Sequence, residues 1–286
     1  HARMVCLGAR ITGACVRTGG ERAWCDMLGL ATQRVNPQSR PEMINAGISG
    51  NTTAAGLARM EKDVVEKQPH LVVVMFGMND VARLPLDDFV ANLTTIIRRS
   101  HAAGAAVILC TPNTVYENAG RPIAKLAELS DRVKKLAKWQ NLLVADCFAE
   151  TTVLKERDHL TWMLGMSDEI HPNMNGHRTM AEVVNQTLTG RHVTLDHVPP
   201  PANALHHTLD KLEAGQPIHL VAMPPYDEKL AVALRGQFPK AEIQVTPWPT
   251  EGKTLAGIRS WAQKIREMKA DPVVPAIPAT SSAESD

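Results

Sequence analysis

The chain of 286 residues lacks an excess of charge of either sign, has few aromatic residues and contains no long hydrophobic run. Its 31 lysines and arginines face 30 aspartates and glutamates, which argues against nucleic acid or an anionic membrane surface as a partner. The apolar runs are only strand-sized, which excludes a membrane-spanning helix. The hydrophobic share of 44% is ordinary for a globular protein, and a chain of this length can bury a core without disulfide or metal staples.

Cysteine is also scarce and unpatterned. The five cysteines are Cys6, Cys15, Cys25, Cys110 and Cys147. Their number is odd and no C-x-x-C occurs, so we expect neither a disulfide framework nor a zinc knuckle. Cys6 and Cys110 fall in apolar, strand-like runs and are predicted core residues. The start at His1 fits a processed chain, and a cleaved signal peptide would leave the same start, so the sequence predicts no compartment.

Proline and glycine divide the chain unequally. Of the 19 prolines, 12 lie in the last 96 residues, whereas 14 of the 18 glycines lie before them. The length itself suggests about two domains, at roughly 150 residues each. We therefore predict an α/β domain over residues 1–190, a Pro-rich linker over 191–201, a partial α/β segment over 202–278 and a frayed tail over 279–286.

Short apolar runs alternate with longer amphipathic stretches along the first domain. The predicted strands are residues 4–8, 43–46, 71–76, 106–110 and 142–145. The predicted helices are residues 21–33, 52–68, 86–101, 124–139, 149–157 and 175–188. Repeated alternation of strand and helix predicts a parallel sheet with helices on both faces.

A second series follows residue 201. Its predicted strands are 218–223, 242–245 and 273–277, and its predicted helices are 204–213, 228–238 and 254–268. A shift of 201 positions aligns Gly56 with Gly257 and Val72 with Val273, among other matches. Two interpretations stay open: half of a second, similar domain, or chance agreement between two helix-strand units. A half-repeat would leave an unpaired edge strand, and residues 202–286 could then mediate homo-oligomer formation.

Four polar, glycine-rich segments fall at the ends of predicted strands or before a predicted helix. They are residues 8–12, 45–52, 77–80 and 168–177. In an open parallel sheet, the loops at the carboxyl ends of the strands gather around one crevice. We therefore expect these four segments to converge.

The segments contain a candidate base and two candidate oxyanion donors. Asp168 lies three residues before His171 and can accept a hydrogen bond from one imidazole nitrogen, so that the other acts as a base. Asn79 offers a side-chain N–H and Gly47 a backbone N–H, and two such donors can stabilise an oxyanion. Each pattern alone is more often an ordinary loop or turn. Their occurrence in register after successive strands favours a site.

In this combination the segments resemble the SGNH (GDSL-type) hydrolase family over about residues 3–190. Residues 45–50 resemble the family's glycine block, residues 77–80 its Gly-x-Asn-Asp block, and residues 168–172 its last block. The resemblance implies a flavodoxin-like three-layer α/β/α sandwich with a parallel sheet and serine-esterase chemistry. His171 would be the general base and acid, oriented by Asp168, with Gly47 and Asn79 as the oxyanion hole. It implies a small ester or an acylated carbohydrate as substrate, and no cofactor or metal.

The chain departs from the family at the nucleophile. Arg10 stands where the family has its serine, and Ala9 replaces the preceding aspartate. A guanidinium stays protonated and is no nucleophile, so we expect the chain as written to be inactive or severely impaired. Thr12 lies two positions too far along, Cys15 lies in a predicted loop, and Ser49 is expected to bond its local backbone. The alternative function is a non-catalytic binding protein in which Arg10 holds an anionic ligand.

Other residues have weaker functional interpretations. Trp162 and Met163, with Leu164 and Met166, could line an acyl pocket or belong to the core. His177 is predicted to be structural, and His206 and His207 to lie on the surface. The 201-residue shift places Trp248 and Thr280 where the first domain has Gly47 and Asn79, so we expect the second part to lack a site.

Overall fold

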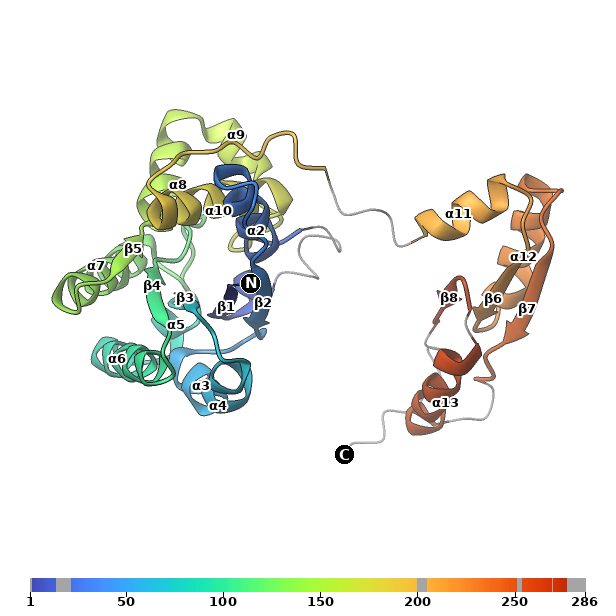
Figure 1. The fold of residues 1–286 in the computed structure, drawn as a ribbon, viewed down its shortest axis with the longest axis horizontal. Coiled ribbons are helices and arrows are strands. Elements are labelled where there is room, and N and C mark those ends of the chain that lie inside the picture. The colour runs from blue at the N-terminus through green and yellow to red at the C-terminus, as the bar shows by residue number, and fades with distance from the viewer. Residues whose placement is uncertain (1, 14–21, 200–204, 251–253, 269, 277–286) are drawn as a thin grey trace. The chain divides into compact units, whose positions relative to one another are not determined.

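The computed structural model describes residues 2–13, 22–199, 205–250, 254–268 and 270–276 (Figure 1). The chain divides into two compact units, residues 1–201 and residues 202–286.

The first unit is built on a five-stranded parallel sheet with the order β2-β1-β3-β4-β5. The strands are β1 (Arg3–Gly8), β2 (Glu42–Gly47), β3 (Leu71–Met75), β4 (Ala106–Cys110) and β5 (Leu143–Ala145). The three central strands are almost entirely buried, as their continuous apolar sequences predicted. This strand order is that of flavodoxin-like sheets, so the predicted fold class is confirmed.

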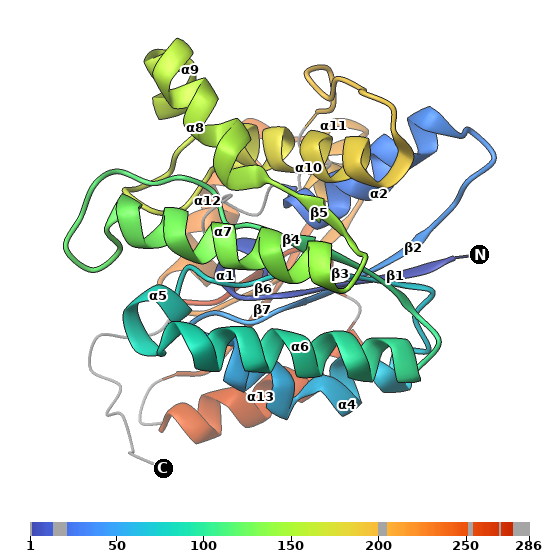
Figure 2. The same ribbon diagram turned by 90° about the vertical axis from the view of Figure 1, so that its left-hand side faces the viewer.

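Helices cover both faces of this sheet. One face packs against α2 (Trp24–Val35), α8 (Cys147–Arg157) and α10 (Met174–Thr189). The other face packs against α3 (Thr53–Ala58), α4 (Met60–Asp63), α6 (Leu86–Ala102) and α7 (Ile123–Trp139). Figure 2 shows α2 and α10 on one side of the strands and α4 and α6 on the other. Alternate strand residues serve the two cores: Cys6 and Val73 join the first, and Val5 and Val72 the second.

The predicted single helix over residues 52–68 is wrong. It is broken into α3, α4 and a 3₁₀ turn, Val65–Lys67, with Arg59 at the first break. The side chain of Arg59 reaches the ends of β1 and β2, a long-range contact that overrides helix periodicity. Three short helices were not predicted: α1 (Arg10–Gly13), α5 (Asp80–Arg83) and α9 (His159–Leu164). Each has six residues or fewer, too few to show a helical period.

The predicted Pro-rich linker packs onto the first unit up to Val198 instead of extending away from it. Leu195 and Val198 are buried in the core that contains α2 and α10. The backbone N–H of Leu195 donates to Glu182 Oε1 at 2.7 Å. These two apolar side chains anchor residues 191–198 to the first unit. Residues 200–204 lie outside the described ranges.

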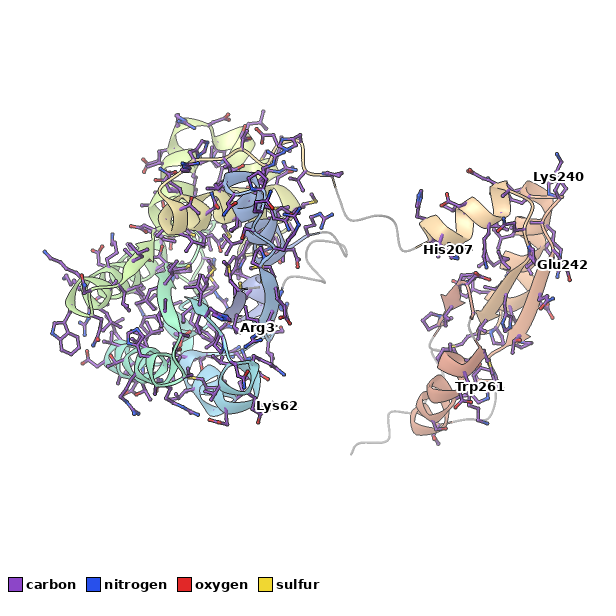
Figure 3. The ribbon with its side chains drawn as sticks, in the orientation of Figure 1. Arg3, Lys62, His207, Lys240, Glu242 and Trp261 are labelled. Atoms are coloured by element: carbon purple, nitrogen blue, oxygen red, sulfur yellow. The ribbon has the colours of Figure 1, made fainter. Side chains whose placement is uncertain are left out.

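The second unit contains a three-stranded parallel sheet with the order β7-β6-β8. Its strands are β6 (Ile218–Ala222), β7 (Ile243–Pro247) and β8 (Val273–Val274). Helices α11 (His206–Glu213) and α12 (Tyr226–Gln237) cover one face, and α13 (Leu255–Met268) covers the other. Trp261 of α13, labelled in Figure 3, stacks on Trp248 with ring centroids 5.8 Å apart.

The topology of this sheet repeats that of β2-β1-β3, with the first strand in the middle. β7 begins 201 positions after β2, whereas β6 begins 215 positions after β1. The second unit is therefore shorter between its first and second strands, in the region that carries Arg10 in the first unit. The half-repeat stays a prediction, because the two sheets share this strand order but not the spacing of their strands. Trp248 is buried at the position of Gly47, and Thr280 lies outside the described residues.

Candidate active site

The carboxyl ends of the central strands lie level with one another. Gly8 of β1 pairs with Gly47 of β2 and with Met75 of β3. The loops that leave this edge of the sheet therefore carry Arg10, the glycine block and Asn79. At Gly47 a Cβ atom would overlap the backbone of Thr12 and Gly13, so only glycine lets α1 pack against the end of β2.

Arg59 fixes the ends of β1 and β2. Its Nη2 donates to Gly8 O at 2.9 Å and to Ala46 O at 2.8 Å. Its Nε donates to Asn51 Oδ1 at 2.7 Å, and its Nη1 pairs with Asp63 at 2.6 Å. The guanidinium adds a hydrogen bond to each of these two carbonyls, and Gly8 O also accepts the backbone N–H of Ile48 at 3.2 Å. Sequence reasoning missed Arg59 because it occupies an ordinary position in an amphipathic pattern.

Asp80 fixes the turn that presents Asn79. Its Oδ1 accepts from the Thr53 backbone N–H and hydroxyl, both at 2.7 Å, and its Oδ2 accepts from Gly77 N at 3.0 Å. Gly77 has a φ of +120°, which favours glycine. Burial raises the pKa of Asp80, and the bonds from Thr53 and Gly77 oppose that shift. Asp80 is therefore a structural clamp between the start of α3 and the turn after β3.

Replacing this clamp should destabilise the first unit. Asp80→Ala leaves the Thr53 and Gly77 donors buried without an acceptor, which should lower the free energy of unfolding by about 3 kcal/mol. Urea denaturation followed by circular dichroism measures the change. Asp88→Ala, at an exposed position on α6, is the control and should change stability by less than about 0.5 kcal/mol. Equal stability of the two variants would contradict the clamp.

The carboxamide of Asn79 is buried and held on both sides. Its Nδ2 donates to Asn51 O at 2.9 Å, and its Oδ1 accepts from Arg121 Nη2 at 3.2 Å. The other candidate oxyanion donor, Gly47 N, donates to Asn45 Oδ1 at 3.0 Å. Use of Gly47 in catalysis therefore requires this N–H to be shared with, or released by, Asn45.

Asp168 and His171 form a close pair. Nδ1 of His171 lies 2.9 Å from both carboxylate oxygens of Asp168. Asp168 Oδ1 also accepts the backbone N–H groups of Ile170 and His171, each at 2.8 Å. Burial alone would raise the pKa of Asp168, but these hydrogen bonds and the imidazole lower it to about 2. Asp168 is therefore ionised at neutral pH and accepts the Nδ1 proton of His171.

The pair lies in a closed loop, residues 164–173. An antiparallel bridge joins Met166 and Pro172, and Ser167 N donates to His171 O at 2.8 Å. Asn173 N donates to Gly165 O at 2.9 Å, and the Asn173 side chain caps α10. These bonds join residues within the loop, so the loop itself determines how Asp168 and His171 lie relative to each other.

The segment after β4, residues 111–122, connects this loop to the rest of the first unit by hydrogen bonds. Asn113 Nδ2 donates to Ile170 O at 3.1 Å, and Tyr116 N donates to Glu169 O at 3.0 Å. The same segment carries Arg121, which contacts Asn79. The candidate base and the candidate oxyanion donor are therefore positioned by one stretch of chain.

His177 is fully buried in α10. Its Nδ1 accepts the backbone N–H of Trp24 at 3.4 Å, which joins α10 to the start of α2. Burial, and secondarily His171, lowers the pKa of His177 to about 3. His177 is therefore a neutral structural residue.

The neutral state of His177 makes stability depend on pH. The unfolded histidine binds a proton near pH 6.5 and folded His177 only near pH 3, so the unfolded state binds more protons between these values. Stability should fall as pH drops below 6.5, by at most about 1.4 kcal/mol per pH unit for this proton. Urea unfolding between pH 7 and pH 4 should show a shallower decline for His177→Gln. An unaltered slope would contradict this assignment, and the exposed His101→Gln is the control.

Arg10 begins α1 and is half-buried. Its Nε donates to Ser49 Oγ at 2.5 Å. The sequence predicts that Ser49 bonds its local backbone, but in the structure its hydroxyl accepts from Arg10. Thr12 is buried, and its hydroxyl faces the backbone around Gly8. Cys15 lies outside the described residues. The Thr12 hydroxyl is therefore enclosed, and the Ser49 hydroxyl is held by Arg10.

Trp162 and Met163 differ in their surroundings. Trp162 is 3% exposed and packs on Tyr116, with ring centroids 4.6 Å apart. It lines a cavity of about 310 Å³ together with Leu164 and Met166, but the described lining residues include neither Asp168 nor His171. Met163 is 40% exposed and does not line the cavity. The burial of Trp162 fits the core interpretation.

Metal-ligand clusters and membrane-spanning helices are absent from the described residues. No group of three or more His, Cys, Asp or Glu side chains among them is placed to hold a metal ion. No helix in this part of the chain is long and apolar enough to cross a membrane. His206 is exposed and pairs with Asp210 at 3.4 Å.

Comparison with known proteins decides the family. The model of the GDSL-like lipase/acylhydrolase family matches residues 6–179. The chain belongs to this family. An acetylxylan esterase of Geobacillus stearothermophilus is 32% identical over 164 residues, which cover 52% of this chain and 73% of that protein. An arylesterase of Vibrio mimicus is 32% identical over 147 residues, which cover 51% and 69%.

Solved structures of an esterase and of a lipase/acylhydrolase resemble the first unit in fold. The crystal structure of an acetylxylan esterase from Geobacillus stearothermophilus matches with a TM-score of 0.57 at 26% identity, over 66% of this chain and 94% of that one. A lipase/acylhydrolase from Enterococcus faecalis matches with a TM-score of 0.56 at 25% identity, over 68% and 98%. The family match contains position 10, Asn79, Asp168 and His171, and it ends before the second unit.

Proposed function

We propose that the first unit is an ester hydrolase scaffold for small acyl or acetyl esters, including acylated carbohydrates, whose nucleophile is replaced by Arg10. The Asp168–His171 pair carries the proposal, because both carboxylate oxygens lie 2.9 Å from Nδ1. This is the arrangement that a general base needs in acyl transfer. The acetylxylan esterase and arylesterase relatives support the substrate class.

The chemistry follows from the contacts. An ester carbonyl oxygen placed at Asn79 would receive an N–H as negative charge develops on it. Nε2 of His171 would take the proton of the attacking oxygen and later return it to the leaving alkoxide, while ionised Asp168 stabilises the imidazolium. No step requires a cofactor. In a serine enzyme the attacking oxygen belongs to the side chain at position 10, and Arg10 supplies none.

The chain as written should therefore hydrolyse esters slowly, with water as the attacking group. Hydrolases that lose one member of the triad retain about 10³–10⁴-fold acceleration over water. Assays with p-nitrophenyl acetate should give a residual rate far below that of a serine esterase, which falls less than tenfold with His171→Ala. Efficient turnover that His171→Ala abolishes would contradict the role assigned to Arg10.

A second candidate function is anion binding, which the arginines around the glycine block favour. Arg10 contacts Ser49, and Arg83 Nη1 donates to the adjacent Gly50 O at 2.8 Å. Burial, and secondarily the charge of Arg83, lowers the pKa of Arg121. Clustered guanidiniums suit a carboxylate or phosphate.

Isothermal titration calorimetry with acetate and with inorganic phosphate tests this second function. Binding that Arg10→Ala removes and Arg34→Ala retains supports it. No heat above dilution with either anion rejects it.

A further inference from the structure

Arg121 connects the two halves of the candidate site. Its Nε donates to Met78 O at 2.8 Å, and its Nη2 donates to Asn79 Oδ1 at 3.2 Å. The guanidinium is also close enough to Asp168 for the two charges to interact. Arg121 thus spans the turn after β3 while it belongs to the segment that holds the Asp168–His171 loop.

The contacts of Asn79 leave its carboxamide one orientation. In that orientation Oδ1 accepts from Arg121 and Nδ2 donates to Asn51 O. A flip would set the amide N–H groups against the guanidinium N–H and the amide oxygen against a carbonyl oxygen. Both contacts would be repulsive, so Arg121 and Asn51 together determine which end of the carboxamide is the donor.

Arginine suits this task better than lysine. The planar guanidinium presents donors in a fixed fork, and here the fork reaches one backbone and one side-chain acceptor of neighbouring residues. A lysine ammonium would keep the charge but lacks the fork. Arg121→Lys therefore separates the orienting contact from the charge.

We propose that Arg121 is a positioning residue for ester hydrolysis, which holds the Asn79 carboxamide with its N–H toward the oxyanion. This inference rests on the proposed function. Arg121 is itself no catalytic residue, because the described hydrogen bonds of its guanidinium are to residues 78 and 79 and not to the reacting atoms. Its removal should affect the transition state, in which charge reaches the carbonyl oxygen, more than substrate binding.

The kinetic test uses the chain with Ala9→Asp and Arg10→Ser. Adding Arg121→Lys should lower kcat for p-nitrophenyl acetate by about 10–10²-fold and leave KM within about twofold, because an oxyanion donor contributes about 10²–10³-fold. Asn79→Ala should cost more, and Arg121→Lys combined with Asn79→Ala no more than Asn79→Ala alone. A rise in KM with unchanged kcat, or additive losses, would overturn the proposal.

Arg34→Lys is the matched control. Arg34 donates to Thr194 O at 2.6 Å from the end of α2, so the change also costs a carbonyl contact, but away from Asn79. It should leave kcat and KM within about twofold. An equal loss of kcat in both variants would show a general effect on folding and would overturn the proposal.

A second measurement does not depend on activity. In the ¹⁵N-labelled chain as written, Arg121→Lys should shift the side-chain N–H₂ resonances of Asn79, assigned by their loss in Asn79→Ala, and Arg34→Lys should not. Unshifted Asn79 resonances would overturn the inference. If the chain with Ala9→Asp and Arg10→Ser is folded but inactive, the proposed function fails, and these resonances still decide whether Arg121 orients Asn79.

Discussion

Changing Ala9→Asp and Arg10→Ser together should raise the rate of p-nitrophenyl acetate hydrolysis by about 10³-fold or more over the chain as written. A hydroxyl at position 10 supplies the attacking oxygen that the existing apparatus lacks, and loss of such a serine elsewhere costs up to about 10⁶-fold in kcat. The groups proposed to act with this hydroxyl are ionised Asp168, His171 paired with it, and Asn79, whose Nδ2 donates to Asn51 O.

The control for this gain is Ala9→Asp with Arg10→Ala, which removes the guanidinium and adds no hydroxyl. It should stay within about tenfold of the chain as written. Arg10 is half-buried with a described contact to exposed Ser49, whereas Ala9 is buried in the core, so circular dichroism must first show that both double variants are folded. A folded Ala9→Asp, Arg10→Ser chain with no more activity than this control would contradict the proposed function.

Asp168→Asn, added to Ala9→Asp and Arg10→Ser, should remove most of the gain, by about 10⁴-fold in kcat. The amide can still accept the N–H groups of Ile170 and His171, so the loop should persist. Its N–H₂ group cannot accept the Nδ1 proton, so His171 would adopt the wrong tautomer for a base.

Asp158→Asn is the matched control for this loss. Asp158 also accepts a backbone N–H three residues ahead, from Thr161 at 3.0 Å, but it caps α9 and touches neither His171 nor Asn79. It should change kcat by less than about twofold. A loss below tenfold for Asp168→Asn would mean that Asp168 only shapes the loop.

The sheet was predictable because the decisive information is local. Residues 71–75 form an uninterrupted apolar run, and the structure buries every one of them. The break at Arg59 was not predictable, because its cause is a guanidinium contact with Gly8, 51 residues earlier in the chain. The burial of Leu195 and Val198 was not predictable either, because it depends on distant residues of α2 and α10.

The candidate site divides in the same way. Asp168 and His171 are three residues apart, and residues 77–80 form a compact block, so pattern alone identified them. Arg121 lies 42 residues from Asn79, and Ser49 lies 39 residues from Arg10. Neither pair has a sequence pattern that relates its members, because only the parallel register of β1, β2 and β3 and the segment after β4 bring them together.

Covalent trapping tests the central claim, a complete esterase site that lacks only its nucleophile. The chain with Ala9→Asp and Arg10→Ser is treated with a serine-directed phosphonofluoridate, and its intact mass and peptide map are measured. We predict one phosphonyl adduct, at position 10, that forms with His171 present, is lost with His171→Ala and is absent from the chain as written. A folded variant without the adduct, or a His171-dependent adduct elsewhere in the chain as written, would contradict the claim.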